Sequence, residues 1–282
     1  MTGLIFILLS VCCSLCIAHL LKLVQREHVS VVPILVINYI TAAGLSLLNT
    51  DIQVIMNETS YTTLFFAFAV GSLFIINFFL YSYSLQKNGV GVSIAAMRLS
   101  LVLPVIVSVW FYNEKLQAYS YLGILFVLIS LLLLIPTVKQ RKGITFSVSL
   151  MFIFLLNGFV DVLLKIYERE FASILSKDHF LFLIFIAAFF VGISYLVVKK
   201  SLKFDLKSII YGILIGIVNL YSSFFLLSAL EKLSGALVFS ITNLLNVFLG
   251  TILGYFYWRD QLVLKQFWGI ILAVFAIILL VI

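Results

Sequence analysis

The sequence predicts an all-α integral membrane protein with ten transmembrane helices, arranged as two inverted five-helix repeats. The first observation behind this is composition: 64% of the 282 residues are hydrophobic and 10% are charged. A soluble domain has roughly 45–50% apolar and about 25% charged residues. The second is that the apolar residues come in runs of about 20, the length that crosses a hydrocarbon core of about 30 Å as a helix. The third is an internal duplication.

Helices are favoured over a barrel because the short alternating segments of barrel strands are absent from the sequence. Backbone groups inside lipid must bond to one another, which leaves a helical bundle. Each predicted helix ends at a polar or glycine-bearing turn, and no connecting loop is long enough for a soluble domain. The predicted helices span residues 3–24, 30–49, 61–85, 90–112, 117–137, 145–166, 179–198, 207–229, 234–257 and 262–282.

The duplication is clearest in two charged segments at helix ends. Residues 20–27 and 163–170 match at five positions, and the matching Lys, Arg and Glu are the most informative because charged residues are scarce. Gly123 matches Gly269 in the same way. The repeats are therefore predicted to cover 1–138 and 144–282. Because five helices are an odd number, the second repeat must enter the membrane from the opposite side, which gives a pseudo-two-fold axis in the membrane plane.

The positive charge predicts contact with lipid headgroups rather than nucleic acid. The formal charge is +7, and most Lys and Arg residues lie in short connections. Their excess in the odd-numbered connections predicts that these face the cytoplasm, with both termini outside and the protein in the plasma (inner) membrane. The first apolar run contains Cys12, Cys13 and Cys16, which we interpret as small buried residues. A disulfide or metal site is not expected there, because no His or acid lies at ligand spacing. No metal or cofactor is expected.

Arg98 is the most informative polar residue. It lies about eight residues into the predicted helix 90–112, roughly 12 Å deep. An arginine at that depth costs a few kcal/mol, so it is expected to line a cavity or meet an anionic group. Snorkelling and a structural ion pair are the alternatives. Pro104, further along, is expected to kink the helix.

Asparagines and glycines form stripes on other helices. Asn243 and Asn246 share one face of the helix 234–257, and Gly212, Gly216 and Asn219 share one face of the helix 207–229. The glycines predict close helix packing. The asparagines either bridge helices or line a water-filled path, and both readings stay open. The candidate substrate-binding residues are Arg98, Asn38, Asn77, Asn219, Asn243 and Asn246.

Four residues are candidates for gating or proton coupling. His19 and Lys22 lie near the end of the first helix, and Asp161 and Lys165 lie near the corresponding end of the sixth. Asp161 and His19 are the candidate proton carriers. In the alternative reading, the lysines are interface anchors and Asp161 pairs with Lys165 at i, i+4. The depths of Arg98 and Asp161 differ by about 11 Å, so no direct salt bridge is expected between them.

The helices 117–137 and 262–282 are almost purely apolar. The first has only Ser130 as a polar break between Leu125 and Ile135, and the second has none after Ile270. They are therefore least able to line a polar path. We expect them on the rim, facing lipid or a second copy of the chain in a homodimer.

Taken together, these features resemble the drug/metabolite transporter superfamily, in particular its ten-helix EamA-type members. The resemblance covers nearly the whole chain. It implies a transporter of amino acids, other metabolites or toxic compounds, with a central cavity lined by helices other than the fifth and tenth. Such relatives have both termini in the cytoplasm, opposite to the charge count here. The resemblance rests on the duplication and on several motifs of the first half: Tyr83-Ser84-Leu85 through Pro104, Glu114 and Gly123. The second half repeats them as Ser228-Ala229-Leu230, Asp260 and Gly269. It departs from the family pattern at Leu249-Gly250, where a second proline is missing.

The predicted function is transport of a small solute by alternating access, with Arg98 favouring an anionic amino acid or other metabolite. The alternatives are a lipid-headgroup flippase and a non-transporting membrane scaffold. An enzyme is not expected, because His19, His28 and His179 are dispersed and no paired acids or HExxH arrangement occurs.

Overall fold

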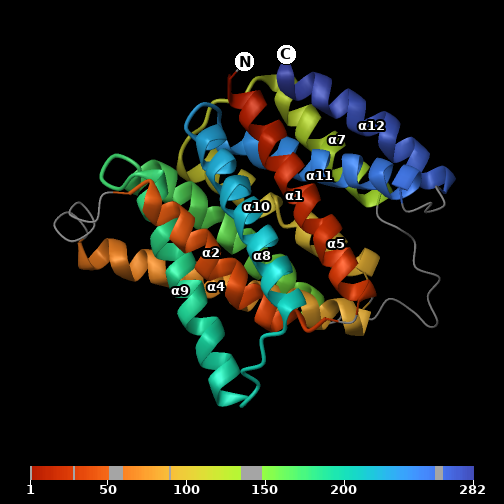
Figure 1. Ribbon diagram of the computed structural model, residues 1–282. Coiled ribbons are helices and arrows are strands. Elements are labelled where there is room, and N and C mark those ends of the chain that lie inside the picture. The colour runs from red at the N-terminus through yellow and green to blue at the C-terminus, as the bar shows by residue number, and fades with distance from the viewer. Residues whose placement is uncertain (1, 28, 51–59, 89, 135–147, 258–262) are drawn as a thin grey trace. The chain divides into compact units, whose positions relative to one another are not determined.

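The computed structural model describes residues 2–27, 29–50, 60–88, 90–134, 148–257 and 263–282, and regular structure within these ranges is helical (Figure 1). Each predicted helical range overlaps an observed helix. The predicted boundary at 138–144 and the predicted counterpart of Glu114, Asp260, lie outside the described residues. The helices are α1 (Thr2–Arg26), α2 (Val31–Leu48), α4 (Tyr61–Asn88), α5 (Val90–Leu99), α6 (Val102–Ile106), η1 (Val107–Phe111), α7 (Ala118–Leu134), α8 (Val148–Ile166), η2 (Tyr167–Phe171), α9 (Lys177–Val198), α10 (Leu206–Leu230), α11 (Gly235–Tyr257) and α12 (Leu264–Val281).

In this part of the chain, eight helices are long and apolar enough to cross a membrane, and Ala96–Phe111 and Ala118–Leu134 are shorter apolar helices. The protein is therefore a multi-pass integral membrane protein. The helices fall into two compact units. Unit 1 contains Met1–Ile76 and Ile166–Ala229, and unit 2 contains Asn77–Lys165 and Leu230–Ile282. Each unit thus combines helices from both halves of the sequence.

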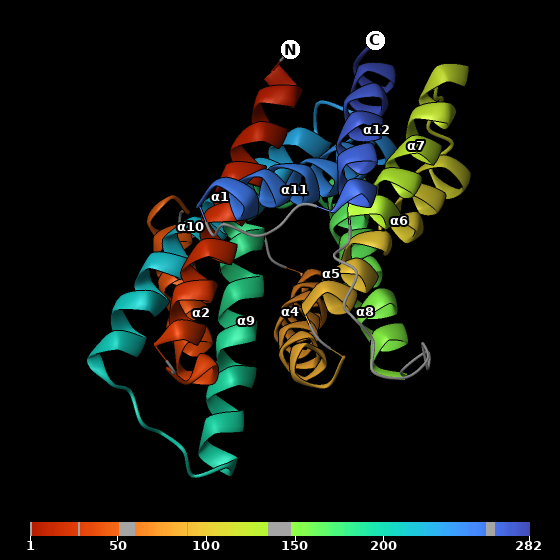
Figure 2. The same cartoon turned by 90° about the vertical axis from the view of Figure 1, so that its right-hand side faces the viewer.

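In unit 1, α2 and α9 pack along their length in opposite directions (Figures 1 and 2). At one end, the Ser46 hydroxyl donates to the Asp178 carbonyl at 2.6 Å. In the middle, the rings of Tyr39 and Phe185 stack with centroids 6.2 Å apart. At the other end, Gly192 lies against α2. Because the contacts move backwards along α9 as they move forwards along α2, the two helices are antiparallel.

The glycine face of α10 also lies in unit 1 and packs on α2. A Cβ atom at Gly212 would come within 2.5 Å of the Ile37 Cβ, and one at Gly216 within 2.7 Å of the Asn38 carbonyl oxygen. Only glycine allows two backbones to approach this closely. The prediction that these glycines serve helix packing is confirmed.

In unit 2, α7 and α12 lie side by side in both ribbon views (Figures 1 and 2). The Ser130 hydroxyl donates to the Gly269 carbonyl at 2.8 Å, and the Gln266 amide donates to the Leu134 carbonyl at 3.1 Å. At the far end, Gly123 lies against Leu280. These contacts show that α7 and α12 are antiparallel, and they satisfy the side chains of Ser130 and Gln266. Their other faces present exposed leucines and aromatic rings, such as Leu122, Leu125, Trp268 and Phe275.

The predicted helix 90–112 is interrupted. It forms α5, α6 and the π-helical turn η1, with a break at Ser100–Leu101. Pro104 has no N–H to donate to the Ser100 carbonyl, and the Leu103 N–H donates to it instead at 3.0 Å. The expected effect of Pro104 is therefore observed as a tightened turn after α5, which ends at Leu99, one residue after Arg98.

Candidate functional site

Unit 2 contains a polar cluster inside its apolar helices. It brings together side chains from α4, the α5–α6 break, α8 and α11. We call the following set the polar cluster: Asn77, Arg98, Ser100, Asn157, Asp161 and Asn243.

Asn157 on α8 is the hub of this cluster. Its Oδ1 accepts a hydrogen bond from the Asn77 amide at 3.1 Å. Its Nδ2 lies 2.8 Å from Ser100 Oγ and 3.2 Å from the Met97 carbonyl oxygen, at the break after α5. The same nitrogen lies 3.5 Å from Asp161 Oδ2. One amide therefore joins α4, the α5–α6 break and the carboxylate of its own helix.

Arg98 reaches α11 from the end of α5. Its Nη1 donates to Asn243 Oδ1 at 3.4 Å. Asn243 is held for this contact because its own Nδ2 donates to the Phe239 carbonyl at 3.0 Å, one turn earlier on α11. A guanidinium has five N–H donors. Within the described residues this long bond is the only hydrogen bond of Arg98, so most of its donor capacity is not used by the protein.

The charges of Arg98 and Asp161 also interact with each other. The described residues show no ion pair between them, in line with the sequence-based expectation. The Asp161 carboxylate is nevertheless nearer to α5 than the depth estimate implied, because Asn157 links it to Met97 and Ser100. An estimate from helical rise alone leaves out how far side chains extend.

The remaining candidate asparagines occupy other places. In unit 1, the Asn219 amide donates to Asn38 Oδ1 at 3.1 Å, so these two bridge α10 and α2. In unit 2, Asn246 lies one turn beyond Asn243 on α11 and is 6% exposed. The structure therefore brings together Asn38 with Asn219, and Arg98 with Asn243, rather than all six residues within one unit.

Lys165, a gating candidate, is fully buried beside Glu114. Its Nζ lies 2.7 Å from Glu114 Oε1, and the two side chains are 0% and 3% exposed. The same carboxylate accepts the backbone N–H groups of Gly235 at 3.0 Å and Ala236 at 3.2 Å, at the start of α11. Lys165 is thus not an interface anchor, and the carboxylate within ion-pair distance is that of Glu114, 51 residues away in sequence.

Local geometry prepares Glu114 for this role. Asn113 adopts a left-handed backbone conformation with φ of 50°, which turns the chain after η1. Burial opposes ionisation of the Glu114 carboxyl, but the hydrogen bonds from Lys165, Gly235 and Ala236 outweigh it and lower its pKa below the ordinary 4.5. Gly235 is needed because a Cβ there would lie 2.9 Å from Lys165 Cε.

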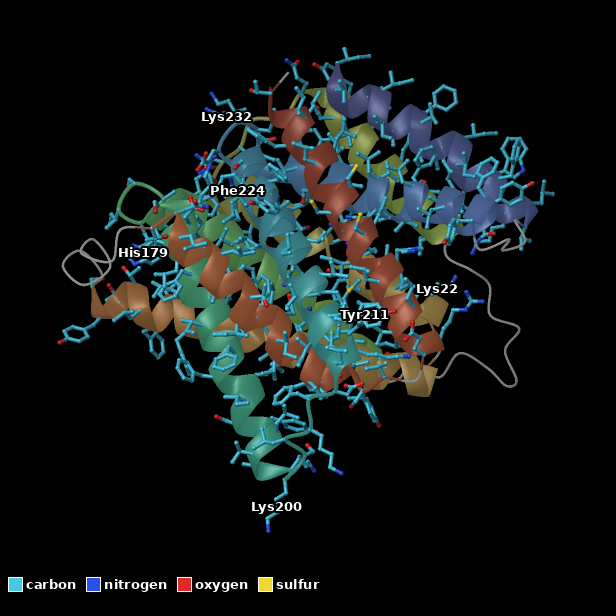
Figure 3. The ribbon with its side chains drawn as sticks, viewed as in Figure 1. Lys22, His179, Lys200, Tyr211, Phe224 and Lys232 are labelled. Carbon is cyan, nitrogen blue, oxygen red and sulfur yellow. The ribbon has the colours of Figure 1, made fainter. Side chains whose placement is uncertain are left out.

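His19 and Lys22 lie in α1, in unit 1, and are half-buried; Figure 3 shows Lys22 near the C-terminal end of that helix. Asp161 and Lys165 lie in unit 2. The gating or proton-coupling role of His19, Lys22, Asp161 and Lys165 stays a prediction. The interpretation of the cysteines as buried is wrong: Cys12 and Cys16 are exposed and Cys13 is half-exposed. In a helix that is apolar all round, composition does not tell a lipid-facing side from a packed one. Within the described residues, no group of His, Cys, Asp and Glu could hold a metal.

Sequence reasoning missed Asn157 and the Glu114–Lys165 pair. Asn157 precedes Asp161 by four residues, so helical periodicity alone places the two on one face of α8. That signal was available. The Glu114–Lys165 pair had no comparable signal, because the two residues lie on different segments.

The apolar spanning helices define a multi-pass membrane protein that carries the charged residues Arg98 and Asp161 within its helices. Residues 1–135 match the model of the EamA-like transporter family. This match confirms, over residues 1–135, the resemblance to the drug/metabolite transporter superfamily.

Two further likenesses extend over nearly the whole chain. A protein of Haemophilus influenzae, described as uncharacterized, is 29% identical over 294 residues, which cover 98% of this chain and 96% of that protein. A protein of known crystal structure has the same fold, with a TM-score of 0.71 over 99% of this chain and 94% of that one, at 15% identity.

Proposed function

We propose that this protein transports a small anionic solute, an amino acid or another metabolite, across the plasma membrane by alternating access. The observation that supports this most directly is Arg98. Its guanidinium lies within an apolar helical segment, and its one described hydrogen bond is the 3.4 Å contact with Asn243. Arginine is the side chain best suited to bind a carboxylate or phosphate, through two parallel hydrogen bonds.

The energetics favour a ligand at this position. A charged side chain inside a bilayer costs several kcal/mol unless it meets an opposite charge or water. Asp161 offers a nearby negative charge but does not lie within ion-pair distance in the described residues. An anionic solute could therefore bind to a guanidinium whose hydrogen-bond donors are largely unused. Asp161 would be the second charged residue of this site. Asp161 is the residue we assign to proton coupling.

Alternating access rests on the proposed inverted repeats, 1–138 and 144–282. The helices α2 and α9 occupy corresponding positions in the two halves, as do α7 and α12. In each pair the partners pack against each other in antiparallel directions. Counterparts that run in opposite directions are what an inverted duplication requires.

The test is a thermal-shift screen of the purified full-length protein in detergent. The probes are the twenty amino acids, a set of nucleosides and a set of mono- and dicarboxylates. A ligand that binds only the folded state raises Tm by mass action. We expect anionic probes to raise Tm in the wild type and to lose that effect in Arg98→Gln.

The matched control is Arg169→Gln, which removes an arginine whose side chain is 40% exposed and lies in unit 1. It should keep the ligand effect. The proposal is wrong if anionic probes raise the Tm of Arg98→Gln as much as that of the wild type, or if only uncharged probes bind.

A further inference from the structure

The face of α11 next to Arg98 carries a second carboxamide oriented like that of Asn243. The Nδ2 of Asn246 donates to the Thr242 carbonyl at 3.0 Å, as that of Asn243 donates to the Phe239 carbonyl at 3.0 Å. These bonds to the helix's own carbonyls fix which end of each amide is oxygen. The Asn243 oxygen accepts from Arg98. The Asn246 oxygen is buried and has no hydrogen-bond partner.

Two hydroxyl groups on the same stretch of α11 are in the same situation. Ser240 Oγ and Thr242 Oγ1 are buried, on residues that are 0% and 8% exposed, and have no partner either. A buried polar atom without a partner costs about 1–3 kcal/mol, and most such atoms in native proteins are satisfied. Three of them within seven residues mark a place where α11 is built to bond to a group outside itself.

We propose that Asn246 Oδ1 accepts a hydrogen bond from a hydroxyl or amino group of the transported solute. The inference rests on the proposed function, in which Arg98 holds the anionic end. Residues three apart on a helix face have Cβ atoms about 5–6 Å apart. The solute is therefore a small anion that carries an O–H or N–H donor close to its acidic group. The hydrogen bond to Asn246 makes the protein bind this solute more tightly than the same acid without the donor group.

The chemistry of the site supports this assignment over a purely structural one. An asparagine that served only to bridge helices would use its oxygen, as Asn38 does for Asn219. The oxygen of Asn246 has no such partner in the part of the chain that the structure describes. The hydroxyls of Ser240 and Thr242 can either donate or accept, so they fit a hydroxyl or an ammonium group equally well.

The experiment measures Tm of the full-length protein with matched acids that differ in one substituent. The sets are propionate, lactate and alanine; 3-phenylpropionate, phenyllactate and phenylalanine; and succinate, malate and aspartate. In at least one set the hydroxy or amino acid should bind about 2- to 10-fold more tightly than its parent, the effect of one hydrogen bond. Asn246→Leu should remove that preference, so that the hydroxy or amino acid binds no more tightly than its parent.

Two further measurements separate binding from folding. Without ligand, Asn246→Leu should keep the wild-type Tm or raise it, because it removes an unsatisfied buried oxygen. Asn246→Asp, which keeps an acceptor, should retain the preference. The inference is overturned if no set shows a preference, if the preference survives in Asn246→Leu, or if that variant loses as much Tm as Asn219→Leu. If Arg98→Gln abolishes binding while Asn246→Leu changes nothing, the proposed function stands and this inference fails.

Discussion

The Glu114–Lys165 pair allows a quantitative prediction. One carboxylate binds the Lys165 ammonium at 2.7 Å and two N–H groups at the start of α11 at 3.0 and 3.2 Å. It therefore ties the turn before α7 to the end of α8 and the beginning of α11. Both side chains are almost completely buried, so solvent does not screen the interaction.

Removing one member of a buried ion pair costs about 3–5 kcal/mol, because the other charge stays buried without its partner. Glu114→Gln leaves Lys165 charged and should approach this full cost. Lys165→Met should cost less, because the Glu114 carboxylate keeps its hydrogen bonds from the backbone N–H groups of Gly235 and Ala236. At about 2 °C per kcal/mol for a chain of this size, the expected loss of Tm is about 6–10 °C for Glu114→Gln. The double variant should lose less than the sum of the single losses.

The assay is thermal unfolding in detergent over a range of pH. Because the folded-state pKa of Glu114 is lowered, its contribution is complete above the ordinary value of 4.5 and disappears as the pH falls through the lower folded value. The difference in Tm between wild type and Glu114→Gln should thus be constant from pH 8 to about 5 and shrink below 4.5. Additive losses in the double variant, or a difference that changes near neutral pH, would refute the reasoning.

Three further predictions follow from the packing, the polar cluster and the charge distribution. Gly212→Ala should lower Tm, because its Cβ would lie 2.5 Å from the Ile37 Cβ, whereas Gly44→Ala, with nothing within 4 Å, should not; equal effects would contradict the packing account. Asn157→Leu should cost about 1–3 kcal/mol by leaving its partners unbonded, and an unchanged Tm would remove it as the hub of the polar cluster. Ser201 lies next to Lys200 at the exposed tip between α9 and α10 (Figure 3). In a background without the native cysteines, Ser201→Cys should react with an impermeant thiol reagent only from the cytoplasmic side. Labelling from outside would reverse the predicted orientation.

Much of the fold could be predicted because each helix has its own signal. Apolar runs of membrane-spanning length predicted the helical ranges, and the glycines of α10 predicted the face on which it packs. Pro104 indicated a disturbance but not its form, because the break at Ser100 depends on which neighbouring N–H replaces the missing one. The grouping of helices into two units that each mix both halves is a tertiary property, and no single segment carries it.

The candidate site was predicted in part. Arg98 stands out because a charge in an apolar helix is costly wherever it points. Its bond to Asn243, at an offset of 145 residues, joins two positions that the predicted duplication would make equivalent. The alternative reading of Lys165 as an interface anchor is wrong, because its burial depends on Glu114 from another segment. An asparagine such as Asn157 carries no charge, so only its spacing from Asp161 distinguishes it.

The proposed function depends on Arg98 binding the anionic group of a transported solute. The most direct measurement uses proteoliposomes loaded with a mixture of amino acids, nucleosides and carboxylates, followed by mass spectrometry of the solutes that leave. Wild-type protein and Arg169→Gln should release at least one anionic solute faster than protein-free liposomes, and Arg98→Gln should not. Equal release by Arg98→Gln and wild type, or release of uncharged solutes alone, would contradict the account.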